Sequence, residues 1–325
     1  RLLEKCSFIK LHPTQIKRAI TSTNEFIEAT NLDIMDSVRQ NEVIPESEIM
    51  VCSLDGVNVL LNQAGKKKGR PLERPVKENI PASSYKSVMC GSISHYNIIH
   101  DKGKKLPERI CSKYIARMPE DYYPTFKREF EKEIKFTNTS PSVTKLVITD
   151  AHKSISGYLK DNTAFVDYQR VIDFYHASEH LSHMAEAIHG KSSAEASEWY
   201  KKYRDILKTH KHGVSKLIRS AEYYLANKSY SKTREKEIQT HLGYFKKHKK
   251  FMEYAGYAEK GWPIGSGVIE AACKSVVKQR MCRSGQRWSI AGGQAILNLR
   301  SIVKSNRWDG FWNEFKKDYY TKLAA

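Results

Sequence analysis

Five segments of β-type sequence, all before residue 176, constrain the fold of this chain more than any other feature. They are rich in apolar, β-branched and aromatic residues, and turn-forming or helical sequence separates them. The segments cover residues 48–61, 85–96, 109–117, 145–149 and 169–175. The first three can pair as an antiparallel meander, whereas the last two, each reached through a crossover, would join in parallel. This order predicts an α/β fold with a mixed five-stranded sheet flanked by helices.

A helical pattern continues from about residue 177 to residue 258, which is too long for a connection inside a compact domain. We therefore expect a large all-α insertion between the fifth strand and a later helix. The predicted organisation is an N-terminal helical segment (1–47), the first part of the core (48–176), the insertion (177–260) and the C-terminal helices of the core (261–325). The chain begins with Arg1, so a further DNA-binding module upstream stays open.

The charge of the chain favours a polyanionic partner. Lysine and arginine number 55 against 36 acidic residues, a net charge of +19. Residues 200–260 alone hold sixteen lysines and arginines against six acids, which predicts a surface for phosphate contacts. No apolar run approaches the roughly 20 residues of a spanning helix, so no membrane partner is expected. The six cysteines form no CxxC pair, which favours a reducing, cytoplasmic compartment.

Three acidic residues come from three separate elements of this predicted sheet system. Asp55 lies within the first strand, although Asp55-Gly56 also fits a hairpin turn. Asp150 directly follows the fourth strand, and Glu270 lies one turn into a later helix. Carboxylates gathered at one point require a cation, and hard oxygen ligands select Mg²⁺ or Mn²⁺. The alternative for Glu270 is a favourable acid near a helix N-terminus.

The helix that carries Glu270 lies in the string GWPIGSGVIEAACKSVVKQRM, residues 261–281. Ser266 can cap its start after the helix-breaking Pro263 and the neighbouring glycines. The helical spacing predicts a buried stripe along one side, formed by Ile269, Ala272, Cys273, Val276 and Arg280.

These motifs resemble the RNase H-like catalytic domain of DDE transposases. The strings 261–281 and RSGQRWSIAGGQAILNLRS resemble the Glu-bearing region of bacterial insertion-sequence transposases of the ISKra type, and VITDAHKSI resembles their second-Asp segment. That family more often has Gly-Ala or a similar small pair in the second-Asp segment. In VIDFYHASEHL, Asp173 and His176 also fit the [C/D]-x-x-H signature of Mutator-like and hAT-like transposases. The resemblance covers roughly residues 48–312.

The resemblance implies a DNA transposase that cleaves and transfers the ends of an insertion sequence by two-metal phosphoryl transfer. The implied partners are double-stranded DNA, as terminal repeats and target, and at least one further copy of the chain, in the bacterial nucleoid. The implied triad, which would hold two Mg²⁺ or Mn²⁺ ions, is Asp55, Asp150 and Glu270, supported by Asp173 and His176. The expected DNA contacts are Lys66, Lys67, Lys68, Lys274, Lys278, Arg283, Arg287 and Trp288, although a tryptophan in such a position more often belongs to the core.

Three alternatives stay open at this level. One is an RNase H-like nuclease that cuts without joining, and another is an inactive, domesticated derivative that only binds DNA. The third is a zinc metallopeptidase, because His176, Glu179 and His180 match H-x-x-E-H and His183 continues the same helix face. The peptidase alternative leaves the high positive charge unexplained.

Overall fold

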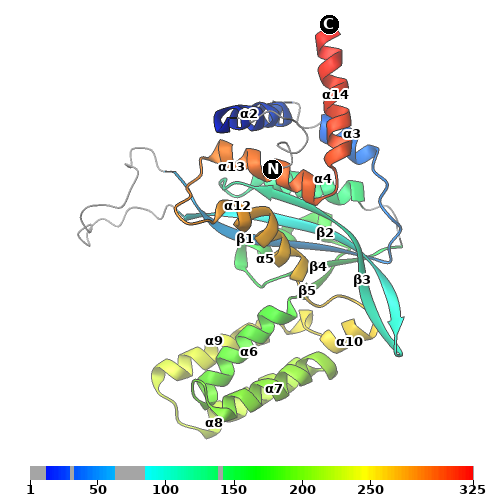
Figure 1. Cartoon of the computed structure of the whole chain (residues 1–325). Coiled ribbons are helices and arrows are strands. Elements are labelled where there is room, and N and C mark those ends of the chain that lie inside the picture. Colours follow the sequence, from blue (N-terminus) through cyan, green and yellow to red (C-terminus); the bar gives the residue numbers. More distant parts are fainter. Residues whose placement is uncertain (1–11, 30–32, 63–84, 138–141, 325) are drawn as a thin grey trace, which may run out of the picture.

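A mixed five-stranded sheet forms the centre of the protein (Figure 1). The computed structural model describes residues 12–29, 33–62, 85–137 and 142–324. The strands are β1 (Ile49–Leu60), β2 (Tyr85–Asp101), β3 (Lys104–Arg117), β4 (Thr144–Thr149) and β5 (Gln169–Ile172). Their order is β3-β2-β1-β4-β5, with antiparallel pairing among the first three and parallel pairing of β4 with β1 and of β5 with β4. The predicted α/β fold, with its meander and two parallel strands in RNase H-like order, is confirmed.

Three strand boundaries differ clearly from the sequence-based expectation. The second and third segments form one long hairpin, in which β2 continues to Asp101 and β3 begins at Lys104. The fifth strand, expected to run to residue 175, ends at Ile172, and helix α6 (Phe174–His189) begins directly after it. The reason is Asp173, whose side chain accepts a hydrogen bond from the backbone N–H of His176 and so starts a helix where the apolar pattern continues.

The two faces of the sheet are covered by different helices. Met50, Cys52 and Leu54 of β1 pack toward α4 (Pro124–Thr137) and α5 (Lys153–Asp161). Val57 and Val59 point to the opposite face, against α11 (Gly267–Ala272) and the π-helical turn η3 (Cys273–Lys278). Helices α12 (Gln279–Met281) and α13 (Ile290–Lys304) complete this layer. The alternation of side chains along β1 thus decides which of the two helical layers a β1 side chain contacts.

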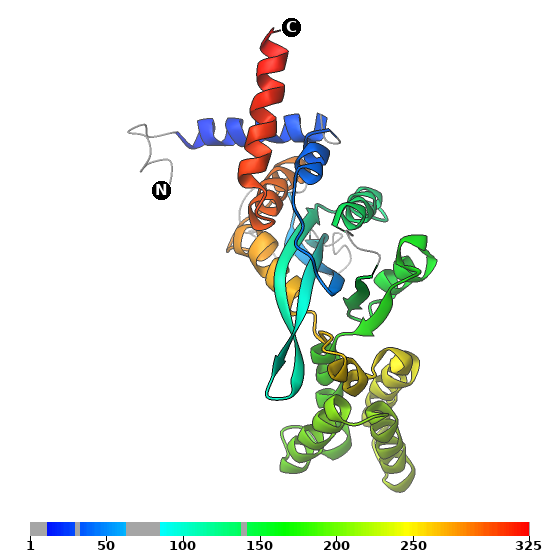
Figure 2. The same cartoon turned by 90° about the vertical axis from the view of Figure 1, so that its right-hand side faces the viewer.

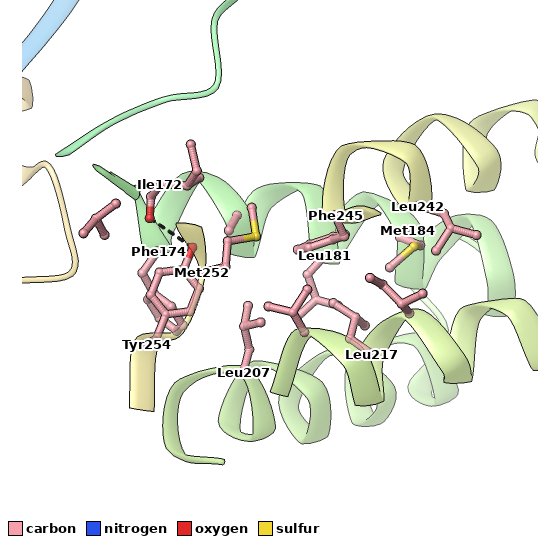
Figure 3. Packing of buried hydrophobic residues seen from close by; sticks show 14 of the residues in the cluster. Ile172, Phe174, Leu181, Met184, Leu207, Leu217, Leu242, Phe245, Met252 and Tyr254 are labelled. Carbon is pink, nitrogen blue, oxygen red and sulfur yellow. Dashed lines mark hydrogen bonds between the residues drawn. The ribbon is translucent and has the colours of Figure 1, made fainter. Parts of the chain in front are cut away.

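The predicted helical segment between β5 and α11 is present. After α6 it contains α7 (Ala194–Thr209), α8 (Gly213–Asn227), α9 (Lys232–His248), η2 (Lys249–Phe251) and α10 (Tyr254–Glu259). Leu181, Leu217 and Phe245 pack together between these helices (Figure 3). The same cluster continues into β4 and β5, and the Tyr254 hydroxyl donates to the Ile172 carbonyl oxygen at 3.0 Å. The insertion therefore shares its core with the end of the sheet.

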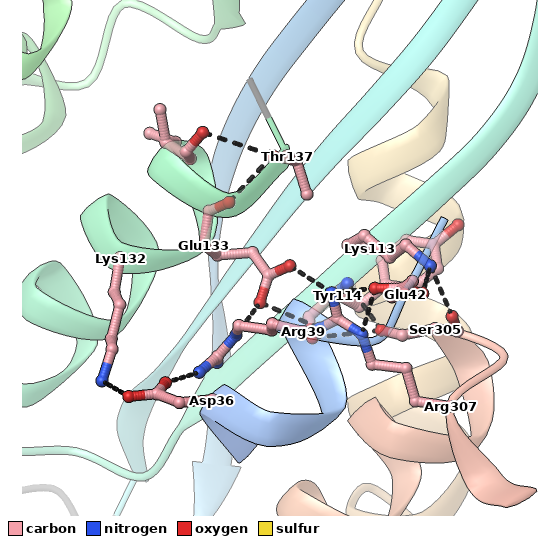
Figure 4. A network of polar contacts seen from close by, with 11 residues as sticks. Asp36, Arg39, Glu42, Lys113, Tyr114, Lys132, Glu133, Thr137, Ser305 and Arg307 are labelled. Atoms are coloured by element: carbon pink, nitrogen blue, oxygen red, sulfur yellow. Dashed lines mark hydrogen bonds and ion pairs between the residues drawn. The ribbon is translucent and has the colours of Figure 1, made fainter. Parts of the chain in front are cut away.

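The N- and C-terminal helices meet at a buried ionic network. Helices α2 (Pro13–Ala29), α3 (Asp33–Gln40) and α14 (Trp308–Ala324) lie at the opposite end of the molecule from the insertion (Figure 2). Glu133 of α4 is fully buried and accepts hydrogen bonds from Arg39 and Arg307, and Arg307 also donates to Glu42 (Figure 4). Within the described ranges, no helix is long and apolar enough to cross a membrane.

Candidate functional site

Asp55 is a strand residue, as predicted, and not part of a hairpin turn. β1 continues through it to Leu60, and Asp55 pairs with Cys90 of β2. Its Oδ1 accepts from the backbone N–H of Gly56 at 2.6 Å, and the Cys273 thiol lies 3.5 Å from Oδ2 as a donor. A hydrogen bond with Cys90, then burial and the nearby Asp55 carboxylate, raise the pKa of that thiol, so it stays protonated and able to donate.

Asp150 leaves the sheet beside Asp55. The parallel register pairs Cys52 of β1 with Val147 of β4, and both aspartates follow three residues later. Residues in register on parallel neighbouring strands point to the same face, so Asp55 and Asp150 share the face that α11 covers. Asp150 Oδ1 accepts from the His152 backbone N–H at 3.0 Å, which holds the turn after β4.

Glu270 faces Asp55 across a surface groove. Ser266 precedes α11 but makes no side-chain cap; its hydroxyl instead donates to Glu270 Oε1 at 3.2 Å. Gly265 lies close to the Tyr175 ring, since an added Cβ would fall 2.6 Å from it. The groove is lined by Asp55, Gly267, Glu270, Ala271, Cys273, Lys274, Lys278 and Gln279. Two carboxylates from distant parts of the chain therefore meet beside two lysines.

The predicted buried stripe of this helix is wrong at its last position. Ile269, Ala272, Cys273 and Val276 are buried, but Arg280 is exposed. The cause is the π-helical turn η3, whose wider turn rotates every later residue relative to an α-helix. Val277 and Met281 occupy the buried positions instead.

Asp173 joins three elements next to Asp150. Its backbone N–H donates to the Thr149 carbonyl oxygen at 3.0 Å, and its buried carboxylate accepts from the backbone N–H groups of His176 and Ser266. His176 is partly exposed, with Nδ1 3.4 Å from Glu179 Oε2. Asp173 thus links β4, α6 and the loop before α11.

The residues expected to contact DNA fall into different environments. Lys274 and Lys278 line the groove, and Arg283 and Arg287 are exposed beyond it. Trp288 is partly buried: its Nε1–H donates to the Met281 carbonyl oxygen at 3.1 Å, and its ring packs with the core beside α11. These contacts match the core alternative for this tryptophan. Residues 66–68 lie outside the described residues.

The donor set suits a hard divalent cation. Asp55, Asp150 and Glu270 together offer the oxygen ligands that Mg²⁺ and Mn²⁺ prefer. Across the part of the chain that the structure describes, however, no group of three or more His, Cys, Asp or Glu side chains is gathered closely enough to hold a metal ion. The residues of the H-x-x-E-H motif do not form such a group either. In this motif, His180 Nδ1 lies 2.9 Å from His241 Nδ1. Burial, followed by the neighbouring His241, lowers the pKa of His180 to about 4.

Two residues near Asp150 were missed by sequence analysis. Tyr244 of α9 and Arg170 of β5 each carry a buried donor without a hydrogen-bond partner, the Tyr244 hydroxyl and Arg170 Nε. Arg170 also donates to Ser156 Oγ at 2.6 Å, and burial lowers its pKa while Asp150 opposes that effect. No local motif signals them, because they reach the site from an edge strand and from the insertion.

Comparison with solved structures gives distant likenesses. The chain is similar to the Drosophila P element transposase strand transfer complex, with 11% sequence identity and a TM-score of 0.27, over 96% of this chain and 82% of that chain. No protein-family model matches the chain, and no curated protein matches it. A similarity of this size carries no argument about the site, which rests on the contacts described above.

Proposed function

We propose that this chain is a DNA transposase that cuts and joins DNA strands by metal-dependent phosphoryl transfer. One observation carries the proposal: Asp55 lies in β1, Asp150 directly follows the neighbouring parallel strand β4, and Asp55 and Glu270 line the same groove. A sheet of this order with one aspartate in β1, one directly after β4 and a glutamate on the helix that covers it supports phosphodiester chemistry, particularly on a chain with a net charge of +19.

Asp55, Asp150 and Glu270 would hold two Mg²⁺ or Mn²⁺ ions. When bound, these ions would supply the positive charge that stabilises charge developing on the phosphate. The protein itself fixes the carboxylates: the Cys273 thiol donates to Asp55, His152 N–H to Asp150 and the Ser266 hydroxyl to Glu270. Lys274 and Lys278 would bind DNA phosphates along the same groove.

The proposed substrates are the double-stranded ends of a mobile element and a target duplex. The helical insertion provides further basic surface, since residues 200–260 carry sixteen lysines and arginines against six acids. Two DNA ends that are joined in one reaction require two sites, so we propose that at least two copies act together.

Strand cleavage on DNA that carries the flanking ends of the gene tests this proposal. Wild type, Asp150→Asn and Glu270→Gln are compared in Mg²⁺ or Mn²⁺, and DNA binding is measured in parallel. We expect discrete cuts with 3′-hydroxyl ends from wild type, and no cuts from either variant at unchanged DNA affinity. Glu259→Gln is the matched control, because Glu259 is an exposed acid whose ion pair with Lys211 is long, at 3.9 Å.

Other outcomes separate the alternatives. Cleavage without any joined product would indicate a nuclease. DNA binding without cleavage by wild type would indicate an inactive derivative. Equal cleavage by wild type and both active-site variants would remove Asp150 and Glu270 from the mechanism and refute the proposal.

A further inference from the structure

The helical segment that runs from α11 through η3 to α12 changes its hydrogen-bond spacing along its length. In η3 the Gln279 backbone N–H donates to the Lys274 carbonyl oxygen, five residues earlier, as in a π-helix. The Cys282 backbone N–H donates to the Lys278 carbonyl oxygen, four residues earlier, as in an α-helix. Between these two bonds the carbonyls belong to Ser275, Val276 and Val277, but the amides only to Arg280 and Met281. At least one carbonyl in the middle of this helical segment therefore has no amide of its own.

Arg300 of α13 supplies donors to this stretch from another helix. Its Nε–H donates to the Val276 carbonyl oxygen at 2.8 Å, and one of its terminal NH₂ groups donates to the Ser275 carbonyl oxygen. The guanidinium is a planar, charged fork, so it can bond two consecutive carbonyls at once. The side chain is partly buried where α13 packs on η3. A side chain of α13 thus stabilises the π turn.

The π turn determines the direction of Lys278. In a regular α-helix, residues four apart are rotated by about 40°, so Lys278 would lie about 80° around the helix from Glu270. A π turn takes more residues per turn and therefore reverses part of this rotation. In keeping with this, Glu270, Lys274 and Lys278 all line the same groove. The carbonyls that Arg300 bonds lie between the two lysines, so they affect the later one, Lys278.

We propose that Arg300 is a positioning residue for Lys278: its two hydrogen bonds stabilise the π turn and so hold the Lys278 side chain in the groove, where it contacts a DNA phosphate. This inference rests on the proposed function, because it assigns the groove to DNA. Arg300 does not itself line the groove, so it acts on DNA binding through the helix.

The test is the salt dependence of DNA binding by Arg300→Met, which keeps a long side chain but removes its donors. Loss of one phosphate contact reduces the slope of log affinity against log salt by about 1 and weakens binding about eightfold near 0.1 M salt. We expect Arg300→Met to approach the loss caused by Lys278→Gln. Arg234→Met is the matched control, because Arg234 of α9 also donates from Nε and a terminal nitrogen to two consecutive carbonyls of another helix, those of Ala187 and Ile188, at 2.9 and 3.2 Å. Both arginine variants should lower the melting temperature by similar amounts.

A double-mutant cycle decides whether Arg300 acts through Lys278. In a Lys278→Gln background, Arg300→Met should reduce the slope no further. The effect of Arg234→Met, whatever its size, should be the same with and without Lys278. If Arg300→Met does not fold, Arg300→Lys takes its place in the same cycle, since it keeps the charge but not the planar fork.

Two results would overturn the inference and leave the proposed function intact. One is a wild-type slope in the Arg300 variant. The other is a further reduction of the slope in the double variant, which would mean that Arg300 contacts phosphate itself. A wild-type protein that does not bind DNA at low salt would instead refute the proposed function, and the inference with it.

Discussion

Replacing Glu133 by glutamine is expected to destabilise the protein by about 3 kcal/mol at neutral pH. Burial alone would raise the pKa of Glu133, but the charges and hydrogen bonds of Arg307 and Arg39 outweigh it and lower the pKa from 4.5 to about 2. By linkage, this difference corresponds to about 3 kcal/mol of folding free energy. Removal of one partner of a buried ion pair typically costs about 3–5 kcal/mol. We expect the lower end of this range, because Asp36 and Glu42 still pair with Arg39 and Arg307 in the variant.

The stability difference between wild type and Glu133→Gln should depend on pH. A carboxylate whose pKa is lower in the folded state stabilises the protein above its unfolded pKa, and that contribution is lost as the pH falls through the folded pKa. The free-energy difference between wild type and Glu133→Gln should therefore be complete above about pH 4.5 and shrink toward about pH 2.

Urea unfolding at a series of pH values measures this difference directly. Glu222→Gln is the control, because the Glu222–Lys246 ion pair has a similar separation of 2.6 Å but is about half exposed on both sides. Its loss should cost under about 1 kcal/mol. If the two variants are equally stable at pH 7, or if the Glu133 difference does not change below pH 4.5, the assigned role of the network is wrong.

Three further predictions address the core, the DNA contacts and the linking carboxylate. Gly91→Ala should destabilise by about 1–3 kcal/mol, because its Cβ would fall 2.7 Å from a phenylalanine ring of α4, whereas Gly243→Ala in α9 meets open space and should be neutral or stabilising in the same unfolding assay. Lys274→Gln and Lys278→Gln should each weaken DNA binding and reduce the slope of log affinity against log salt by about 1 in fluorescence titrations. Asp173→Asn places a donor against a backbone N–H and should lower both the melting temperature and cleavage, whereas Asp150→Asn should lower only cleavage.

Much of the fold could be predicted because its signals are local. The apolar strand segments determine the number and order of strands, and connection length determines which of them pair in parallel. The Asp55 and Asp150 positions follow from the same pattern, since one lies within a strand and the other directly after one. The end of β5 was misplaced because Phe174 and Tyr175 continue the apolar run, while the capping bond of Asp173 ends the strand before them.

Other features depend on contacts that no local pattern encodes. The π-helical turn moves Arg280 to the surface, and the sequence there is compatible with an ordinary α-helix. Tyr244 reaches the surroundings of Asp150 only because α9 packs on α6. The partial burial of Trp288 likewise requires the chain after α12 to return beside β1, where it pairs with Leu61.

The position of the insertion in the chain has a mechanical consequence. Asp173 immediately precedes the insertion and Ser266 follows it, yet the Asp173 carboxylate accepts the Ser266 backbone N–H. The same carboxylate caps α6 through His176, and the Asp173 backbone N–H donates to Thr149 beside Asp150. The Ser266 hydroxyl in turn donates to Glu270. The residues that flank the insertion on its two sides are therefore hydrogen-bonded to each other beside Glu270. We therefore expect a displacement of the helical insertion to act first on the residues that hold Glu270 and Asp150.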